Sequence, residues 1–250
     1  MTLPRRRRQR CEPAGAWATP IMQKLQSKFP LLGCLLPVDD EPDVQLQIAL
    51  ESRQGELLSA GEHLLPGLSR YCGGFLHDSW VTGIARSGKA LHLALNEFKT
   101  HCFCERLALV KGLKIGHDDV HMPLTLRFQN VTDVSLWHIG PDGSLEPLPW
   151  ESQVGGLREW LWEEVREITK QRIALGIVFW AEERSEESSD YVLMSVVAER
   201  LEFVEGQREA FLRLFGAGFA KVFDAFWAQN MHRNFELTDQ ELTDWLAEAE

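Results

Sequence analysis

Two groups of His and Asp residues hold the side chains of this 250-residue chain that could do chemistry. His77 and Asp78 are neighbours, and His117 and His121 follow further along the chain. Imidazole and carboxylate groups hold metal ions and transfer protons, so one hypothesis is a small metal-dependent hydrolase that uses His77 and Asp78 with His117 or His121. The other interpretation is structural. His77 and Asp78 would then satisfy backbone groups where a strand begins, and 117–121 would be a polar loop.

The cysteines predict no metal centre. His101, Cys102 and Cys104 could begin a zinc site, but the sequence lacks a second Cys pair at ligand spacing. We therefore expect cysteines that pack as small hydrophobic side chains, with no metal and no cofactor. Five cysteines are an odd number without a framework spacing, which favours a reducing compartment. Nucleophile-elbow, phosphate-loop and HExxH motifs are also missing from the sequence, so an enzyme is the weaker hypothesis.

The charge favours a basic protein as partner. The formal net charge is −11, and removing the five arginines of the first ten residues leaves −16 for the rest of the chain. Such a body repels nucleic acid and anionic membranes, and it attracts basic proteins. The apolar runs fall short of the roughly 18 to 20 residues that span a bilayer, so we expect no membrane contact.

The arginine-rich start predicts a disordered basic tail over residues 1–20. Two alternatives remain open. Met22 could be the true start of the protein, or the arginines could bind phosphates as a nucleic-acid arm. The apolar core of a secretory signal does not follow the arginines, so the predicted location is the cytoplasm.

Hydrophobic patterning predicts an α+β protein with a mostly antiparallel sheet, an N-terminal helix and helices at the C-terminus. We expect a helical segment over 21–74 that forms one globular unit with an α+β domain over 75–250. A hairpin over 75–95 should reverse at Ser87 and Gly88. Further strands are predicted at 120–128, 131–139, 172–180 and 191–198, and helices at 157–168, at 211–226 and after a capping box at 238–241.

Two of these strands should lie at the middle of the sheet. Residues 172–180 and 191–198 are apolar on both faces, which is typical of strands that are covered on both sides. The acidic loop 182–190 should join them as an antiparallel hairpin. Residues 97–115 show no clear pattern and carry no prediction.

The hairpin carries a resemblance to known proteins. The run Leu76-His77-Asp78-Ser79-Trp80-Val81, followed by Gly83-Ile84, a short turn and Leu91-His92-Leu93-Ala94-Leu95, resembles the HDS-type β-hairpin of several bacterial families of unknown function. Some of these families are grouped with the immunity proteins of polymorphic toxin systems. The resemblance implies a cytoplasmic, immunity-like binding protein without catalysis, and it assigns no functional residues.

The expected helix over 157–168 supplies the candidate binding surface. Its apolar stripe would leave Glu163, Glu164 and Glu167 on the outer side, where they could attract a basic partner. Trp162 lies off the stripe and would be an exposed aromatic anchor. The alternative is a solvated helix face with a tryptophan that packs against a neighbouring element.

Overall fold

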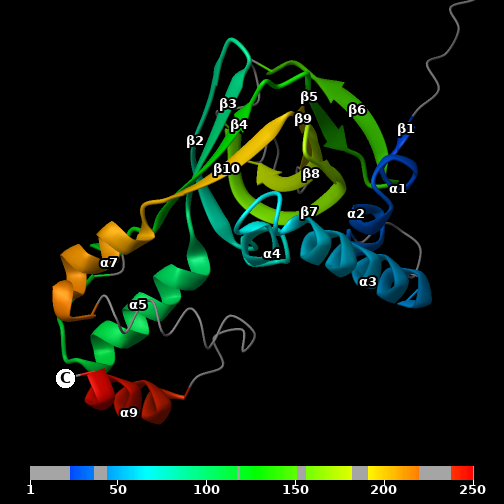
Figure 1. Ribbon diagram of the computed structural model, residues 1–250. Coiled ribbons are helices and arrows are strands. Elements are labelled where there is room, and N and C mark those ends of the chain that lie inside the picture. The colour runs from blue at the N-terminus through cyan, green and yellow to red at the C-terminus, as the bar shows by residue number, and fades with distance from the viewer. Residues whose placement is uncertain are drawn as a thin grey trace, which may run out of the picture.

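The computed structural model describes residues 23–36, 44–116, 119–150, 156–181, 191–219 and 238–249. These ranges contain one antiparallel sheet of ten strands, with helices before and after it, which confirms the predicted α+β class (Figure 1). None of the described helices is long and apolar enough to cross a membrane. The strands are β1 (Gln23–Lys24), β2 (Ser79–Ser87), β3 (Ala90–Asn96), β4 (Pro123–Gln129), β5 (Asp133–Ile139), β6 (Ser144–Leu148), β7 (Leu157–Thr169), β8 (Arg172–Ala181), β9 (Tyr191–Ala198) and β10 (Arg200–Glu205).

The sheet closes on itself because two of its strands continue, after a bend, into two others. Its order is β1-β6-β5-β9-β8-β7-β2-β3-β4-β10. Only residues 130–132 separate β4 from β5, and only Glu199 separates β9 from β10. At the bend, the Asn130 side chain donates a hydrogen bond to Glu199 Oε2 at 2.7 Å. The bent pair β4–β5 and β9–β10 therefore joins β3 back to β8, and the strands between them form a ring.

The inside of this ring holds the main hydrophobic core. The hairpin β2–β3 forms as predicted, and Gly88 takes φ 57 in its turn, a conformation that suits glycine. Along β3 and β4 every second residue is buried, which confirms the alternation seen in the sequence. The inward-facing residues of β3, β4 and β8 are Leu91, Leu93, Leu95, Leu124, Leu126, Phe128, Ile173, Leu175, Ile177 and Phe179.

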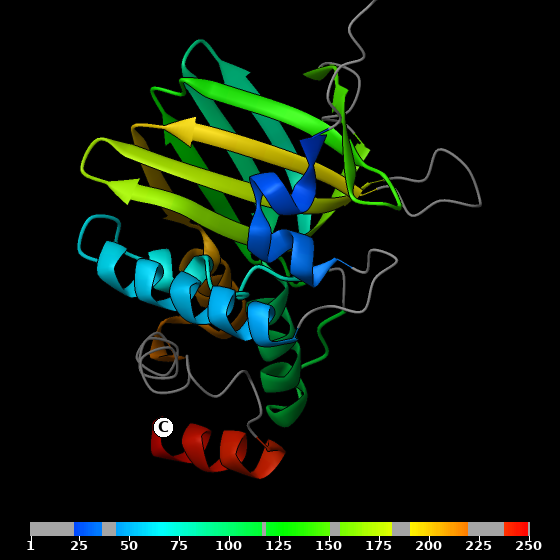
Figure 2. The same ribbon diagram turned by 90° about the vertical axis from the view of Figure 1, so that its right-hand side faces the viewer.

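A second, smaller core covers the outside of the sheet at β8 and β9. The short helices α1 (Leu25–Lys28) and α2 (Pro30–Leu35) lie over these strands (Figure 2). A Cβ on Gly176 of β8 would overlap the Phe29 ring, so this close approach requires glycine. The pairing of β8 with β9 and their central position confirm the prediction from their two apolar faces. The connecting acidic loop, 182–190, lies outside the described residues.

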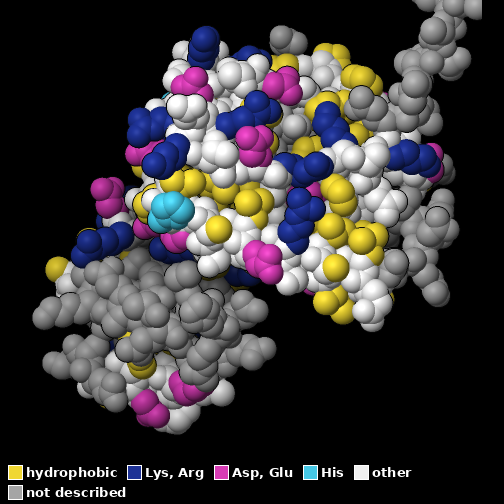
Figure 3. Space-filling model, turned by 45° about the vertical axis from the view of Figure 1, so that its right-hand side comes forward, with side chains coloured by type: hydrophobic (Ala, Val, Ile, Leu, Met, Phe, Trp, Pro, Cys, Tyr) yellow, Lys and Arg dark blue, Asp and Glu magenta, His cyan; other side chains and the backbone are white. Residues whose placement is uncertain are grey.

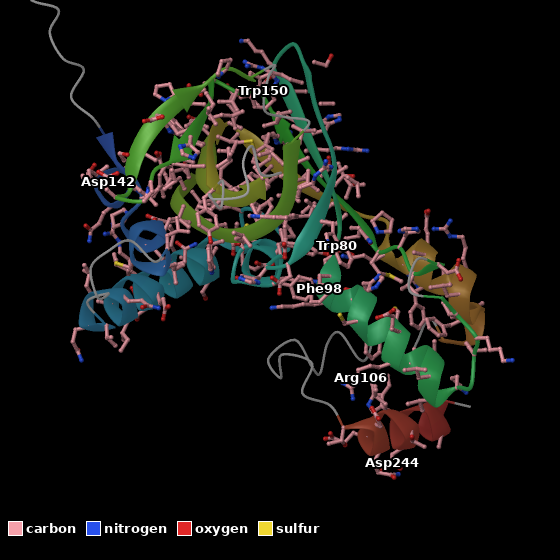
Figure 4. All side chains as sticks on the ribbon, turned by 180° about the vertical axis from the view of Figure 1, so that it is seen from behind. Trp80, Phe98, Arg106, Asp142, Trp150 and Asp244 are labelled. Atoms are coloured by element: carbon pink, nitrogen blue, oxygen red, sulfur yellow. The ribbon has the colours of Figure 1, made fainter. Side chains whose placement is uncertain are left out.

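Helices cover one end of the ring and extend from it. The helix α3 (Val44–Gly61) runs beneath the sheet, and the short α4 (Leu68–Tyr71) buries Leu68 and Tyr71 completely (Figure 2). The remaining described helices are α5 (Phe98–Val110), α7 (Gln207–Phe215), η3 (Ala217–Phe219) and α9 (Asp239–Ala249). Arg106 of α5 pairs with Asp239 of α9 at 2.8 Å, and Figure 4 shows Arg106 beside α9.

The predicted capping box at the start of α9 is confirmed. The Thr238 N–H donates to Glu241 Oε2 at 2.7 Å, and the Glu241 N–H donates to Thr238 Oγ1 at 3.2 Å. These two bonds satisfy N–H groups that the helix itself leaves without partners.

Several segments differ from the predictions. Residues 157–168, expected to be a helix, belong to the strand β7. Of the aromatic helix expected over 211–226, residues 211–215 belong to α7, which ends at Phe215 because Gly216 takes φ 83, the left-handed conformation that commonly ends helices. Residues 220–226 lie outside the described residues. The helical segment expected over 21–74 starts with two short helices, and Pro30 begins the second one, where its missing N–H costs nothing. The predicted basic tail, residues 1–20, lies outside the described residues.

Candidate functional site

His77 and Asp78 lie in a tight turn directly before β2. Asp78 has φ 68, a left-handed conformation that Asp adopts more readily than most residues. Its backbone N–H donates to Trp160 O of β7 at 2.9 Å, and its Oδ1 lies 2.6 Å from His77 Nδ1. The side chains of His77 and Asp78 are 35% and 41% exposed, so this His–Asp pair is open to solvent at the junction of β2 and β7.

A buried glutamate of β7 holds this turn in place. Glu163 is 6% exposed, and its Oε1 accepts a hydrogen bond from the Gly74 N–H at 2.8 Å. Its other oxygen accepts from Trp160 Nε1 at 2.7 Å. Burial raises the pKa of Glu163 above its ordinary value, although both hydrogen bonds act in the opposite direction. Glu163 therefore fastens the turn to the sheet and is not a surface charge.

Two further ionisable groups surround the pair. Burial, together with the nearby carboxylate of Asp78, raises the pKa of Glu159 on β7. Lys99 of α5 donates to Gly74 O at 2.7 Å, and its burial lowers the pKa of the ammonium group. Trp80, the second residue of β2, packs edge-on to Phe98 of α5 with ring centroids 5.4 Å apart (Figure 4). His77, Asp78, Glu159, Glu163 and Lys99 thus form a polar cluster where the turn, β7 and α5 meet.

The hydrolase hypothesis also requires His117 or His121 beside His77 and Asp78. The described contacts do not join His121, which is exposed just before β4, to either His77 or Asp78. His117 lies outside the described residues. Within the described ranges, no group of three or more His, Cys, Asp or Glu residues could hold a metal ion. Among the described residues, the geometry brings a second carboxylate, Glu159, to the pair, and it does not bring His121.

The predicted acidic binding face is not present as expected, because its helix is a strand. Glu164 is 6% exposed, and its Oε2 accepts from the Leu31 and Leu32 N–H groups at 2.9 and 3.2 Å, at the start of α2. Glu167 pairs with Arg172 at 3.0 Å. Trp162 is half-buried and packs edge-on to His77 with ring centroids 5.5 Å apart. Together with Glu163, these residues lack the exposed helical surface on which the prediction depended.

The segment around the cysteines packs as the sequence indicated. His101 and Cys104 are buried in α5, and a ring nitrogen of His101 is hydrogen-bonded to Val120 O. Burial raises the pKa of the Cys102 thiol to about 11. A thiol with so high a pKa is a poor nucleophile and metal ligand near neutral pH.

A groove of about 700 Å³ opens beside β10, far along the sheet from the His77 turn. It lies between three segments: the strand β10 with the preceding Glu199, the tip of the β7–β8 hairpin and the 63–66 turn. Figure 1 shows β10 crossing the front of the sheet above α4. The apolar lining residues are Leu64, Leu65, Pro66, Ile168, Ile173, Leu201 and Phe203, and the polar ones are His63, Gln129, Thr169, Lys170, Glu199, Arg200 and Glu202.

The described surface carries little net charge. The described ranges hold 22 Asp and Glu against 18 Lys and Arg, which gives −4. The face seen in Figure 3 shows side chains of both signs scattered among hydrophobic ones. Most of the acidic excess therefore lies in residues outside the described ranges, and the groove itself has Lys170 and Arg200 against Glu199 and Glu202.

Local patterns in the sequence do not predict this groove. Leu201 and Phe203 alternate with Arg200 and Glu202, which is a visible strand signal, but the sequence does not show that β10 is an edge. That fact depends on the bend at Glu199 and on the pairing of β10, among the described strands, with β4 alone. Comparisons of the chain with family models, with curated proteins and with solved structures found no match.

Proposed function

We propose that this protein is a binding protein rather than an enzyme, and that it receives a protein partner in the groove beside β10. The observation that carries the proposal is the coincidence of a roomy groove with the sheet edge at β10. The groove offers apolar side chains such as Leu64 and Phe203 beside charged ones such as Lys170, and a sheet edge carries backbone groups that a segment of another protein can bond.

The bonding of the buried glutamates supports binding over catalysis. Glu163 and Glu164 each bond two N–H donors of the protein itself, as does Glu97 at the start of α5. Carboxylates committed in this way hold elements together and have little capacity left for a substrate. The exposed pair His77–Asp78 has the carboxylate of Glu159 beside it.

The basic partner remains part of the proposal because of the total charge. A chain of net charge −11 attracts a basic protein, and salt weakens this attraction because it screens exposed charges beyond about a Debye length. The groove would then supply the short-range contacts. An immunity-like role in the cytoplasm, which the hairpin resemblance implies, fits a protein that acts by binding alone.

The test uses a matched pair of variants in the full chain. His63 is an exposed groove residue, and His92 is an exposed residue on the outer face of β3. A partner captured from the source organism is identified, purified and titrated against wild type, His63→Trp and His92→Trp. We expect His63→Trp to weaken binding about tenfold or more, a loss of about 1.4 kcal/mol, because the larger ring fills the groove. His92→Trp should bind as wild type does.

Salt provides the second measurement. Raising the ionic strength should slow association markedly and leave dissociation nearly unchanged, as electrostatic steering requires. Equal affinities of the two tryptophan variants would refute the groove as the binding surface. Association that ignores salt would refute the basic partner.

A further inference from the structure

The strand β10 leaves one of its edges without a partner strand in the described part of the chain. In the sheet order β10 is terminal, and it pairs only with β4, from Arg200 opposite Gln129 to Glu205 opposite Leu124. The opposite edge of β10 borders the groove, because residues 199–203 all line it. An exposed strand edge carries a row of N–H and C=O groups and is a template for a further strand.

The hydrogen-bonding pattern shows which residues have these free groups. The Gly206 N–H donates to Pro123 O, directly opposite, at 2.9 Å. In an antiparallel pair, residues alternate between those that bond the partner and those that point away. Val204, Glu202 and Arg200 therefore bond β4, whereas Leu201 and Phe203 direct their N–H and C=O groups toward the groove.

The side chains along this edge define the chemistry of an incoming strand. Leu201 is buried and Phe203 half-buried, and both face the core side, with the Phe203 ring 4.7 Å from the Tyr71 ring. Arg200 and Glu202 face solvent on the other side, and the described residues offer neither of them an ion pair or a side-chain hydrogen bond. Opposite charges on directly facing residues of neighbouring strands attract, and like charges repel.

The geometry points to an extended segment of the partner protein that adds to β10 as a further strand. This inference rests on the proposed function and names the form of the partner. The segment has apolar side chains opposite Leu201 and Phe203, an acidic one opposite Arg200 and a basic one opposite Glu202. Its backbone bonds Leu201 and Phe203, which fixes its register, and its side chains provide the selectivity.

The test uses synthetic peptides of about eight residues, a common strand length. One repeats Glu-Val-Lys-Val, the second alternates Val with Lys, and the third alternates Val with Glu. The Val–Lys peptide places a like charge opposite Arg200, and the Val–Glu peptide places one opposite Glu202. Wild type should therefore bind the mixed peptide about two- to fivefold more tightly than either of them. The variant Arg200→Glu presents two acidic side chains and should prefer the Val–Lys peptide. The variant Glu202→Arg should prefer the Val–Glu peptide.

A backbone readout separates strand addition from other docking. Methylating one peptide N–H at a time should weaken binding of the mixed peptide at every second position and leave the positions between unchanged. Bound peptide should also slow amide hydrogen exchange at Leu201 and Phe203, while Val204, which already bonds β4, changes little. A peptide that binds with no two-residue period in the methylation series would overturn strand addition.

The remaining outcomes are also decisive. Absence of binding by all three peptides at about 1 mM would overturn the inference. So would protection of Leu201 and Phe203 that depends on protein concentration alone, because a second copy of the chain would then occupy the edge. If a captured partner is sensitive to His63→Trp but the methylation series shows no period, the groove stands as the binding surface and only the strand form fails.

Discussion

Glu97 offers the sharpest test of the electrostatics of this fold. It is completely buried at the start of α5, where its oxygens accept from the Lys99 and Thr100 N–H groups at 2.6 and 2.7 Å. Burial nevertheless outweighs these bonds and raises its pKa from 4.5 to about 7. The variant Glu97→Gln keeps the shape of the protonated acid and removes its titration.

The expected magnitude follows from linkage. Between pH 4.5 and about 7, Glu97 is protonated in the folded protein and ionised in the unfolded chain. Folding then takes up a proton, so the free energy of unfolding falls as the pH rises from 4.5 to about 7. Glu97 therefore contributes least to stability at high pH. Each pKa unit corresponds to 1.36 kcal/mol, which makes the total change about 3 kcal/mol.

The measurement is urea unfolding of wild type and Glu97→Gln at several pH values from 4 to 8, with tryptophan fluorescence as the readout. The free energy of unfolding of wild type should fall relative to the variant by about 3 kcal/mol across this range. Glu56→Gln, which removes the same charge from an exposed position on α3, serves as the control. A difference between wild type and Glu97→Gln that does not change with pH would refute the reasoning. A difference of the opposite sign would show that the two hydrogen bonds outweigh burial.

Three further predictions concern the sheet and its segments. Ile177→Asp should lower the free energy of unfolding by about 5 kcal/mol or more and leave little soluble folded protein, because it buries an unpaired charge at a fully buried position of β8. Soluble protein with an unchanged melting temperature would contradict the central placement of this strand. Gly176→Ala should lower stability by about 1 to 3 kcal/mol in thermal unfolding, because its Cβ would displace the Phe29 ring. Gly83→Ala, where an added Cβ meets nothing within 4 Å, is the matched control for that substitution. Elemental analysis of the purified protein should find no stoichiometric zinc, and about one zinc per chain would contradict the interpretation of His101, Cys102 and Cys104.

Local patterns in the sequence were sufficient where one strand face or one helix end decides the structure. The alternation of Leu91, Leu93 and Leu95 predicted β3, because a strand with one buried face repeats every two residues. Thr238 and Glu241 predicted the start of α9, because a capping box depends only on residues three apart. The apolar residues on both faces of β8 and β9 predicted their central position, which the outer cover of α1 and α2 explains.

The tertiary structure alone decided the roles of the glutamates of β7 and of the edge of β10. The pairing of β7 with β8 shifts register between Leu157 and Glu159, between Trp160 and Trp162, and between Val165 and Glu167. Each irregularity breaks the two-residue alternation, so the buried residues fall at spacings that imitate a helix. Glu163 and Glu164 are buried only because Gly74 and the start of α2, distant in sequence, bring N–H donors to them. The free edge of β10 likewise exists because the sheet bends at Glu199 and closes through another pair of strands, which no local pattern encodes.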